Sequence, residues 1–584
     1  MILQALKEYY DRKAADPYSD IAPEGFEKKP IPFLIVIKPN GELVNIEDTR
    51  ERVGRTMIGK TFLLPRSKTR TGGKSFATTF LLWDHIGYLF GHPETDKKTA
   101  KQHQTWLNSL NTLPDDLKQD EGVKAVLLFY SEANGVKAVK AHSVWSECLR
   151  LPSCNMTFRF TSDSTPVPCR PAVQNYVRSF VTQIATPDEE DNDDKKVFGR
   201  CLITGEYGEI ARTHGRTPIN KDTKSLVSFQ KNSGYDSFGK EQCYNAQVCK
   251  SSEFSYTTGL NTLLKSARQR IWVGDVTTVF WSEKSSSFEN EVFFFFSEPP
   301  KDDPDRNTEA VKALYESIWS GAYVVPDDET RFYVLGLSPN SARIAVRFWH
   351  VGTVREMGKR FKQHVDDLAI VHGVKIDPAL PMRKLLRSIA PQEKDDNIPP
   401  NLAGDTMRSI LEGAPYPATL LQAAIRRNRA EQDVTYPRAA LIKACLNRTL
   451  RFNNPVNEKE LTMCIDPENT NIGYRLGRLF AALEKIQSDA NPGINATIRD
   501  RFYGAASGSP VTVFGNLMRL SNHHLSKLEK EKPGLFVVRK QLIGEIMCPI
   551  SDFPAHLDMA DQGRFAIGYY HQMQDFYTKK TDNQ

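Results

Sequence analysis

The stretch Tyr474–Gln487, YRLGRLFAALEKIQ, decides the fold of the C-terminal part of the chain. Its large apolar side chains recur at intervals of three and four residues, at Leu476, Leu479, Phe480, Leu483 and Ile486. This spacing places them on one face of an α-helix of roughly three to four turns. A helix with a single apolar stripe must bury that stripe against neighbours, so the stretch predicts a bundle of helices.

Similar stripes continue to the end of the chain. One follows Ser509 and Pro510, which are typical of a helix N-cap and first turn, and comprises Val513, Phe514, Leu517, Ser521, Leu525 and Leu528. Two further stripes comprise Leu535, Val538, Leu542 and Ile546, and then Met559, Ala566, Tyr569, Met573 and Phe576. We therefore expect residues 405–584 to form an all-α helical bundle.

The first part of the chain has a different pattern, with short apolar runs of strand length. These runs are Phe33–Ile37, Val126–Tyr130, Cys201–Thr204, Phe293–Phe296 and Phe332–Leu335. Asn40-Gly41 after the first run is typical of a tight hairpin. Helical patterns lie between the runs, at Lys97–Asn111 and Glu309–Trp319. Residues 1–390 are therefore predicted to form a mixed α/β domain with long insertions.

The two parts are separated by residues 391–404, which are rich in Pro, Asp and Asn and which we interpret as a linker. The predicted fold class is thus α+β. With 40% hydrophobic residues among 584, the chain has enough apolar material for two to four domains. The acidic run Asp188–Asp194 is predicted to be a surface loop, because like charges cannot be buried together.

Composition excludes several classes of protein. No apolar run reaches the ~18 residues of a membrane helix, and charges interrupt Met1–Asp16, so we expect a cytoplasmic protein without membrane contact. The nine cysteines include no CxxC pair, which favours reduced, mostly buried thiols over a metal site. A net charge of +6 is too small to indicate a polyanionic partner, so local clustering must decide that question.

Gly54–Thr61 matches the P-loop pattern GxxxxGK[ST] and raises the alternative of a P-loop NTPase. A P-loop requires a buried strand before the first glycine and a helix after the lysine. The preceding residues Ile46–Val53 are highly charged, and Pro65 interrupts the following segment. The pattern is therefore a weak indication of nucleotide binding.

The same region is strongly basic. Between Arg50 and Lys74 the chain carries eight basic residues and the single acid Glu51. Hydroxyl side chains and glycines lie among them, and these groups can hold phosphodiester oxygens. The candidate phosphate-binding residues are Lys60, Arg66, Lys68, Arg70 and Lys74. The alternative is a solvated loop without a ligand.

A second candidate segment, Ser228–Gln242, is rich in amides, lysines and glycines. Asn and Gln can donate to and accept from base edges, and lysine can reach guanine. The candidate DNA-binding residues are Lys231, Asn232, Tyr235, Lys240 and Gln242. The alternative is an ordinary polar loop. A third basic pattern, Arg343 and Arg347 on a strand followed by Arg355–Lys362 on a helix, is more typical of a solvated face.

Catalytic motifs are scarce. The sequence contains no HExxH and no GxSxG, and its histidines are scattered except for His523-His524. We expect no enzyme activity, no cofactor and no bound metal.

Several segments together resemble one family, the large subunit of the bacterial subtype I-C CRISPR Cascade complex. They occur in order along nearly the whole chain: MILQALKEYYDR (1–12), CLITGE (201–206), SFQKNSGYDSFGKEQ (228–242), WVGDVTTVFW (272–281), LGLSPNSARIAVRFW (335–349) and YRLGRLFAALEKIQ (474–487).

The resemblance implies a non-catalytic subunit of a CRISPR-RNA-guided surveillance complex. Such a subunit recognises a short PAM in duplex DNA, aids duplex opening, steadies the displaced strand and helps recruit a helicase-nuclease. Its expected partners are the CRISPR-RNA-containing Cascade subunits, including backbone, handle-binding and small subunits, and target double-stranded DNA. A purely architectural ribonucleoprotein subunit is the alternative.

The resemblance also implies that a small subunit can arise by internal translation of the same gene. Met463 is a plausible start, giving residues 463–584, which contain the stripes described above, and Met407 is a second candidate.

Overall fold

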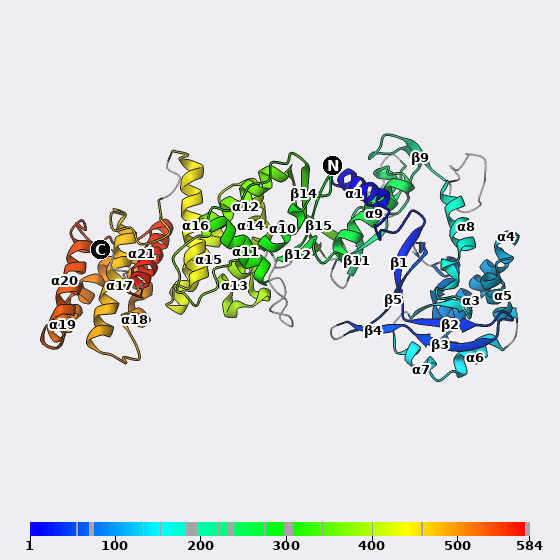
Figure 1. Ribbon diagram of the computed structural model, residues 1–584, viewed down its shortest axis with the longest axis horizontal. Helices are drawn as coiled ribbons and strands as arrows, with labels where there is room; N and C mark the ends of the chain where they lie inside the picture. The colour runs from blue at the N-terminus through cyan, green and yellow to red at the C-terminus, as the bar shows by residue number, and fades with distance from the viewer. Residues whose placement is uncertain are drawn as a thin grey trace. The chain divides into compact units, whose positions relative to one another are not determined.

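The structure is a computed structural model that describes residues 1–577 except 54–55, 69, 71–74, 132–133, 152–153, 183–195, 220–221, 231–238, 274–275, 297–307, 341–342, 400 and 457–459. The chain divides into two compact units, the first comprising residues 1–217 and 225–262 and the second residues 218–224 and 263–584. Helices make up about 52% and strands 17% of the chain. From Val354 onward the described residues contain helices and no strand (Figure 1), which confirms the α+β prediction.

The first unit is built on a four-stranded sheet of order β3-β2-β7-β6. Its central strand β2 (Phe33–Ile37) is buried along its whole length. It pairs antiparallel with β3 (Leu43–Asp48) and parallel with β7 (Asn155–Phe160), and β6 (Trp83–His85) forms the far edge. The hairpin predicted from Asn40-Gly41 is confirmed: Gly41 has φ of +82°, which favours glycine.

Helices pack against this sheet, with Trp106, Phe129 and Phe158 in the shared core. The helices that begin in this unit are α1 (Ile2–Ala15), α2 (Ile86–Phe90), α3 (Lys97–Asn111), α4 (Asp115–Lys118), α5 (Glu121–Ser131), α6 (Gly135–Ala141), α7 (Trp145–Leu149), α8 (Pro171–Thr182) and α9 (Lys250–Lys265). The helix predicted at Lys97–Asn111 is thus confirmed.

A second, three-stranded sheet of order β1-β5-β4 extends from the first unit. The long strand β5 (Thr56–Pro65) pairs with β1 (Phe26–Ile31) through its second half and with β4 (Arg50–Val53) through its first half. The β4–β5 end is therefore a two-stranded ribbon that projects beyond β1 (Figure 1). Two short hairpins complete the strands: β8 (Phe198–Arg200) with β9 (Tyr207–Glu209), and β10 (Arg216–Ile219) with β11 (Asp222–Ser225).

Three of the strand predictions are wrong. Val126–Tyr130 lies in helix α5 and Phe293–Phe296 lies in helix α10 (Phe288–Phe296). A short apolar run fits a buried helix as well as a buried strand, and here the helical neighbours extend it. Cys201–Thr204 forms the turn between β8 and β9, which ends at Gly205.

The second unit begins with an antiparallel sheet of order β12-β13-β14-β15. Its strands are β12 (Arg270–Val273), β13 (Val276–Ser282), β14 (Arg331–Asn340) and β15 (Arg343–Thr353). Helices α10 and α12 (Val354–Leu368) pack against the sheet, and α11 (Thr308–Trp319) packs against α10 and α12. Phe280, Phe332 and Phe361 belong to the core that sheet and helices share. The strand predicted at Phe332–Leu335 and the helix predicted at Glu309–Trp319 are confirmed.

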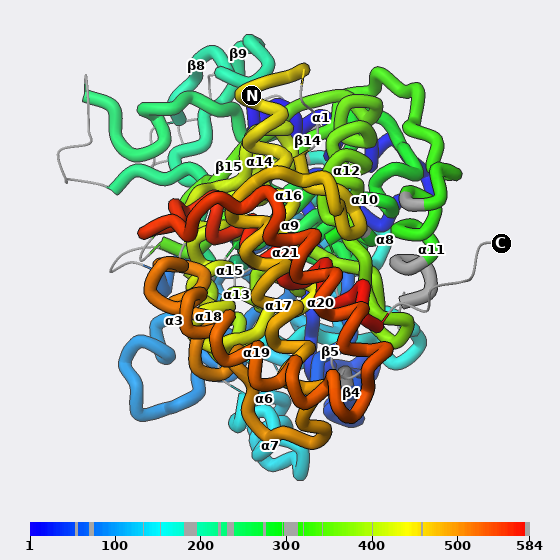
Figure 2. The backbone as a smooth tube through the Cα atoms, turned by 90° about the vertical axis from the view of Figure 1, so that its left-hand side faces the viewer, coloured from blue at the N-terminus to red at the C-terminus, as the bar shows by residue number. Residues whose placement is uncertain are grey.

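The remainder of this unit is helical. Its helices are α13 (Met382–Ile389), α14 (Leu402–Glu412), α15 (Ala418–Glu431), α16 (Tyr436–Asn453), α17 (Ile472–Ala490), α18 (Ile498–Gly508), α19 (Phe514–Glu531), α20 (Pro533–Met547) and α21 (Met559–Tyr577). All five predicted stripe residues of α17 are buried. Helices α17 and α21 lie side by side (Figure 2), close enough that Gly477 and Gly568 face the backbone of the opposite helix.

One predicted stripe is partly wrong. Val538 on α20 is 55% exposed, and of the four residues predicted to be buried there only Ile546 is fully so. Leu535 and Leu542 of the predicted stripe are partly buried and pack against the core. Phe536 and Ile543 pack beside them where α20 meets α17 and α19, because apolar residues surround the helix and leave more than one possible face.

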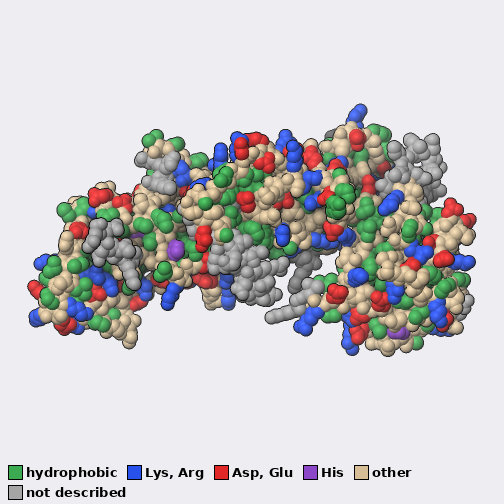
Figure 3. Space-filling model, viewed as in Figure 1, with side chains coloured by type: hydrophobic (Ala, Val, Ile, Leu, Met, Phe, Trp, Pro, Cys, Tyr) green, Lys and Arg blue, Asp and Glu red, His purple; other side chains and the backbone are tan. Residues whose placement is uncertain are grey.

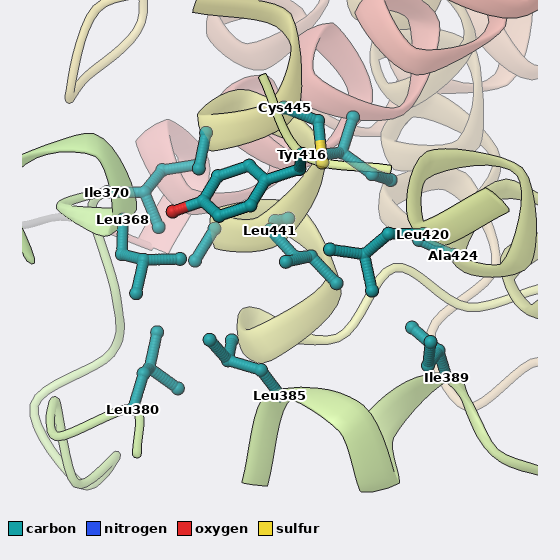
Figure 4. Close-up of a cluster of buried hydrophobic side chains, with 14 of the residues drawn as sticks. Leu368, Ile370, Leu380, Leu385, Ile389, Tyr416, Leu420, Ala424, Leu441 and Cys445 are labelled. Carbon is teal, nitrogen blue, oxygen red and sulfur yellow. The ribbon is translucent and has the colours of Figure 1, made fainter. Parts of the chain in front are cut away.

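The segment 391–404, predicted to be a linker, lies inside the second unit. Ile398 and Leu402 from this segment are buried in the same core as Leu385 of α13 and Leu441 of α16. Figure 4 shows part of that core, with side chains from both sides of the segment pointing toward one another. The compact units therefore do not divide at 391–404, because these two apolar side chains tie an otherwise polar segment to the core.

Candidate nucleic-acid interface

The β4–β5 ribbon presents cationic and apolar side chains to solvent. Arg52 and Lys60 are exposed, and Met57 and Ile58 between them are 52% and 44% exposed. Met57 lies opposite Arg52 in the register, so an apolar and a cationic side chain share one face of the ribbon. Figure 3 shows Lys and Arg side chains on this projecting hairpin. A narrow basic ribbon of this kind can enter a groove of duplex DNA.

The P-loop pattern has a different geometry from a nucleotide-binding loop. Its described residues Thr56–Thr61 lie within strand β5, which continues to Pro65. Lys60 is paired with Ile31 of β1 rather than standing at the start of a helix. These residues therefore do not form the strand-loop-helix cradle that surrounds a nucleotide phosphate.

Arg66, just beyond β5, forms an ion pair with a buried carboxylate. Its guanidinium donates to both oxygens of Glu253 on α9 at 3.2–3.3 Å, and it lies 4.8 Å from the centre of the Phe254 ring. Glu253 is 4% exposed and also accepts from the backbone N–H of Gly215 at 2.7 Å. Arg66 thus fixes the end of the ribbon strand to α9, and its charge is largely neutralised there.

Arg70 also forms an ion pair with a buried carboxylate. Its guanidinium forms an ion pair with Asp84 of β6, whose side chain is fully buried, and lies 3.7 Å and 3.9 Å from the ring centres of Phe80 and Tyr88. Its Nε also donates to the carbonyl of Thr78 at 2.8 Å. Burial raises the pKa of Asp84, and the Arg70 partner opposes that rise. Arg70 therefore anchors the basic loop rather than projecting from it.

Lys60 and Lys68 differ from these two arginines. Both are exposed, and neither forms a salt bridge with any residue in the described ranges of the chain. Lys74, the last predicted phosphate ligand, lies outside the described residues. Of the four predicted phosphate ligands that the structure describes, Lys60 and Lys68 are the two that are exposed to solvent.

The amide-rich segment is described only at its end. Lys231, Asn232 and Tyr235 lie outside the described residues. Lys240 is exposed, whereas the Gln242 side-chain oxygen accepts from Nε of Arg212 at 2.8 Å. Gln242 has φ of +48°, and the turn it begins is closed by Asn245, whose amide donates to the Lys240 and Gln242 carbonyls at 3.0 Å.

The two predicted segments are linked through residues 212–215. Arg212 holds Gln242, and its carbonyl accepts from the backbone N–H of Cys243 at 3.1 Å. Three residues further on, Gly215 donates to Glu253, which also holds Arg66. Arg212 and Glu253 were not predicted from the sequence, because their partners Gln242 and Arg66 are far away along the chain and no local pattern marks them.

Two arginines of the third basic pattern are held by contacts within the protein. Arg347 on β15 donates from Nε to Ser338 at 2.5 Å. Arg355 on α12 pairs with Asp327 and Glu329. These contacts favour the solvated face predicted from the sequence over a track for phosphates.

The cysteine side chains lie mostly in the interior of the protein. All nine cysteines are free thiols, and six of them are buried. The part of the chain that the structure describes contains no group of three or more His, Cys, Asp or Glu residues arranged to hold a metal ion. In the same described ranges, no helix is long and apolar enough to cross a membrane.

Comparison with known proteins identifies the family. The family model described as CRISPR-associated protein (Cas_Csd1) matches residues 6–577. No curated protein matches the chain. The match spans both compact units and includes every segment on which the resemblance to a Cascade large subunit rests, apart from the first residues. The chain therefore belongs to the Cas_Csd1 family of CRISPR-associated, Cascade-type proteins.

Proposed function

We propose that this protein is the non-catalytic large subunit of a subtype I-C Cascade that recognises the PAM in duplex DNA. In this role it aids duplex opening, steadies the displaced strand and helps recruit a helicase-nuclease. One observation carries the proposal: Lys60 and Lys68 are exposed on a segment braced by the Arg66–Glu253 and Arg70–Asp84 pairs, and Lys240 is exposed beside the turn that the Arg212–Gln242 hydrogen bond holds. A braced framework with exposed cations is suited to holding a DNA backbone in a fixed register.

The proposed roles follow from the contacts of each side chain. Lys60 and Lys68 bind phosphates, together with Lys74. Arg66 and Arg70 hold these lysines in place, because their own charges are already paired. Lys240 contacts base edges with Lys231, Asn232 and Tyr235, and Gln242 fixes the turn beside Lys240 through its bond to Arg212.

The exposed apolar residues of the ribbon suggest how the duplex opens. Met57 and Ile58 stand beside Arg52 and Lys60 on the projecting ribbon. Proteins that distort DNA insert such apolar side chains between base steps while nearby cations hold the phosphates. We assign Met57 and Ile58 this role at the base pairs next to the PAM.

A PAM-library binding assay with the assembled guide-loaded complex tests the proposal. Lys240→Ala should reduce the preference among PAM sequences, whereas Lys60→Ala and Lys68→Ala should weaken binding to all duplexes. Lys124→Ala, which removes an exposed lysine of α5 in the same unit, serves as the matched control. Unchanged affinity and unchanged preference in all three test variants would instead favour a purely architectural subunit.

We also propose that Met463 starts a second, shorter product comprising residues 463–584. Met463 lies in an exposed position before α17, and helices α17–α21 all follow it. Helices α17 and α21 of this segment pack closely against each other, and Phe480 and Phe565 meet between them within the core of the second unit. Replacing Met463 by a residue that cannot start translation should remove the short product from cells, and a persistent short band would contradict the assignment.

A further inference from the structure

Strand β15 forms one edge of the sheet in the second unit, and its register shows which of its backbone groups face outward. The backbone N–H of Val354, the residue after β15, donates to the carbonyl of Thr330 at 2.9 Å, in continuous register with the β14–β15 pairs. Hydrogen-bonded and non-hydrogen-bonded pairs alternate along antiparallel strands. Residues at even positions from 348 to 354 are therefore bonded to β14, whereas Trp349 and Val351 direct their N–H and C=O groups away from it.

These outward groups are available for further pairing. The neighbouring outward groups on either side are occupied, because the carbonyl of Arg347 accepts from Arg408 of α14 at 3.2 Å and the N–H of Thr353 donates to Glu356 at 3.0 Å. Among the described residues, no strand pairs with β15 on this side and no hydrogen bond reaches the outward groups of Trp349 and Val351. A partner strand would find two N–H and two C=O groups at the spacing of a β-ladder.

The second half of β15 also lacks the features that normally protect a sheet edge. Charged side chains, prolines and bulges prevent unwanted strand addition. The first half of β15 has Arg343 and a register shift opposite Gly336 and Leu337. Residues 348–353, FWHVGT, contain no proline, no Lys or Arg and no register shift. Val351 there is 46% exposed, so this half presents both open backbone and apolar surface.

A pocket of about 420 Å³ lies beside this edge, between β15 and α14. Its floor is formed by Phe348 and Leu411, which are 5% and 1% exposed. The ring of Trp349 lies on the other face of the sheet, stacked 5.6 Å from Tyr333, so Trp349 borders the pocket through its backbone. An added strand would place alternate side chains on the two faces, one into the pocket and the next against the Trp349 ring.

The rim of the pocket favours a cationic side chain from the partner. Glu412 of α14 is exposed there and forms no salt bridge with any residue that the structure describes, whereas the Arg408 guanidinium is directed to a carbonyl. Burial lowers the pKa of His350, so its ring is neutral at neutral pH and can accept a hydrogen bond. Glu412 and His350 thus offer acceptors to a Lys or Arg.

A nucleic-acid strand is the main competing occupant, and two features disfavour it. Its backbone supplies acceptors but no N–H donors at strand spacing, so it would leave the outward carbonyls of Trp349 and Val351 unpaired. The carboxylate of Glu412 would also repel its phosphates. A polypeptide meets both the backbone and the charge requirement.

We infer that the second half of β15 is a docking edge for an extended segment of another subunit, which adds to the sheet as a fifth strand and places a Lys or Arg beside Glu412. The inference rests on the proposed function only in that the assembled complex supplies the partner. It does not depend on PAM recognition.

Hydrogen exchange with residue-level fragmentation compares the full chain alone with the guide-loaded complex in the absence of target DNA. The amides of Trp349 and Val351 should exchange at least about 30-fold more slowly in the complex. Those of His350 and Gly352 should be protected in both samples, because they are bonded to β14. Equal exchange of Trp349 and Val351 in the two samples would overturn the inference. Protection of these amides by the guide RNA alone, or in the isolated chain at high concentration, would also overturn it, since the occupant would then be nucleic acid or a second copy.

Glu412→Lys provides a second test that leaves the sheet intact, because Glu412 is exposed on α14. Reversing this charge should weaken association of the chain with the remaining subunits about tenfold in a native mass spectrometry titration. Asp405→Lys is the matched control, because Asp405 is an exposed acid of the same helix that does not line the pocket. An equal effect of both variants would contradict the assigned cation contact. PAM-dependent binding by the Lys60 and Lys68 variants is measured separately, so the two ideas can fail independently.

Discussion

Replacing Gly477 by alanine should weaken the packing of α17 against α21. A Cβ atom at Gly477 would overlap the carbonyl oxygen of Phe565 and lie 2.8 Å from the backbone nitrogen of Tyr569. Both atoms belong to the backbone of α21, so no side chain can move aside to relieve the overlap. The two helices must separate, and the apolar side chains between them lose contact.

The magnitude follows from two opposing effects. Overpacking a well-filled interior destabilises by about 1–3 kcal/mol, and a backbone obstruction favours the upper end. Alanine in a helix interior is more stable than glycine by about 1 kcal/mol. The net destabilisation should therefore be about 2 kcal/mol. This corresponds to roughly 30-fold faster exchange of amides that exchange by separation of the two helices.

Hydrogen exchange followed by mass spectrometry measures this effect in peptides from α17 and α21. Gly544→Ala on α20 is the matched control, because a Cβ at that position has no atom within 4 Å. It should leave α17 and α21 unchanged and stabilise α20 by up to about 1 kcal/mol. Equal or slower exchange in α17 and α21 of the Gly477→Ala variant would refute the packing described for these helices.

Three further predictions concern the Arg70–Asp84 ion pair, the buried histidines and the exposed lysines. Arg70→Ala leaves the buried Asp84 carboxylate without its partner and should lower the free energy of unfolding by about 3 kcal/mol in thermal melts, whereas Lys68→Ala should change it by less than about 0.5 kcal/mol. Burial lowers the pKa of His364 and His571 from 6.5 to about 3 in the folded chain, so the unfolded chain binds more protons as the pH falls through 6.5. Stability should therefore be complete above pH 6.5 and should fall by about 2 kcal/mol for each histidine at pH 5, and a flat stability profile between pH 7 and 5 would contradict this. The double variant Lys60→Ala, Lys68→Ala should lower the slope of log affinity for duplex DNA against log salt by about 1 to 2, and an unchanged slope would show that neither lysine contacts a phosphate.

The local sequence pattern was sufficient to predict the structure where a single physical requirement determines the conformation. The five stripe residues of α17 are buried as expected, because their spacing leaves a single apolar face. Asn40-Gly41 predicted its hairpin, because few residues other than glycine adopt the positive φ that the turn requires. Val126–Tyr130 could not be assigned in this way, since its apolar residues fit a buried helix and a buried strand equally well.

The candidate site was predictable in its composition but not in its geometry. The basic segment predicted five phosphate ligands, yet Arg66 and Arg70 are paired with carboxylates. Glu253 is 187 positions from Arg66 in the chain, and only the folded structure brings it there. Charge counting identifies where cations are numerous. It does not tell which of them remain available to a ligand, because that depends on partners supplied by tertiary contacts.

Site-specific photo-crosslinking in the guide-loaded complex tests most directly whether DNA lies against the braced segments. A photoreactive amino acid replaces Lys60, Lys240 or the control residue Lys124, one at a time, and the duplex target carries a label beside the PAM. We expect crosslinks from positions 60 and 240 to the duplex within a few base pairs of the PAM, and none from position 124. Crosslinks from positions 60 and 240 to other protein subunits alone, with the labelled DNA captured elsewhere, would contradict this expectation.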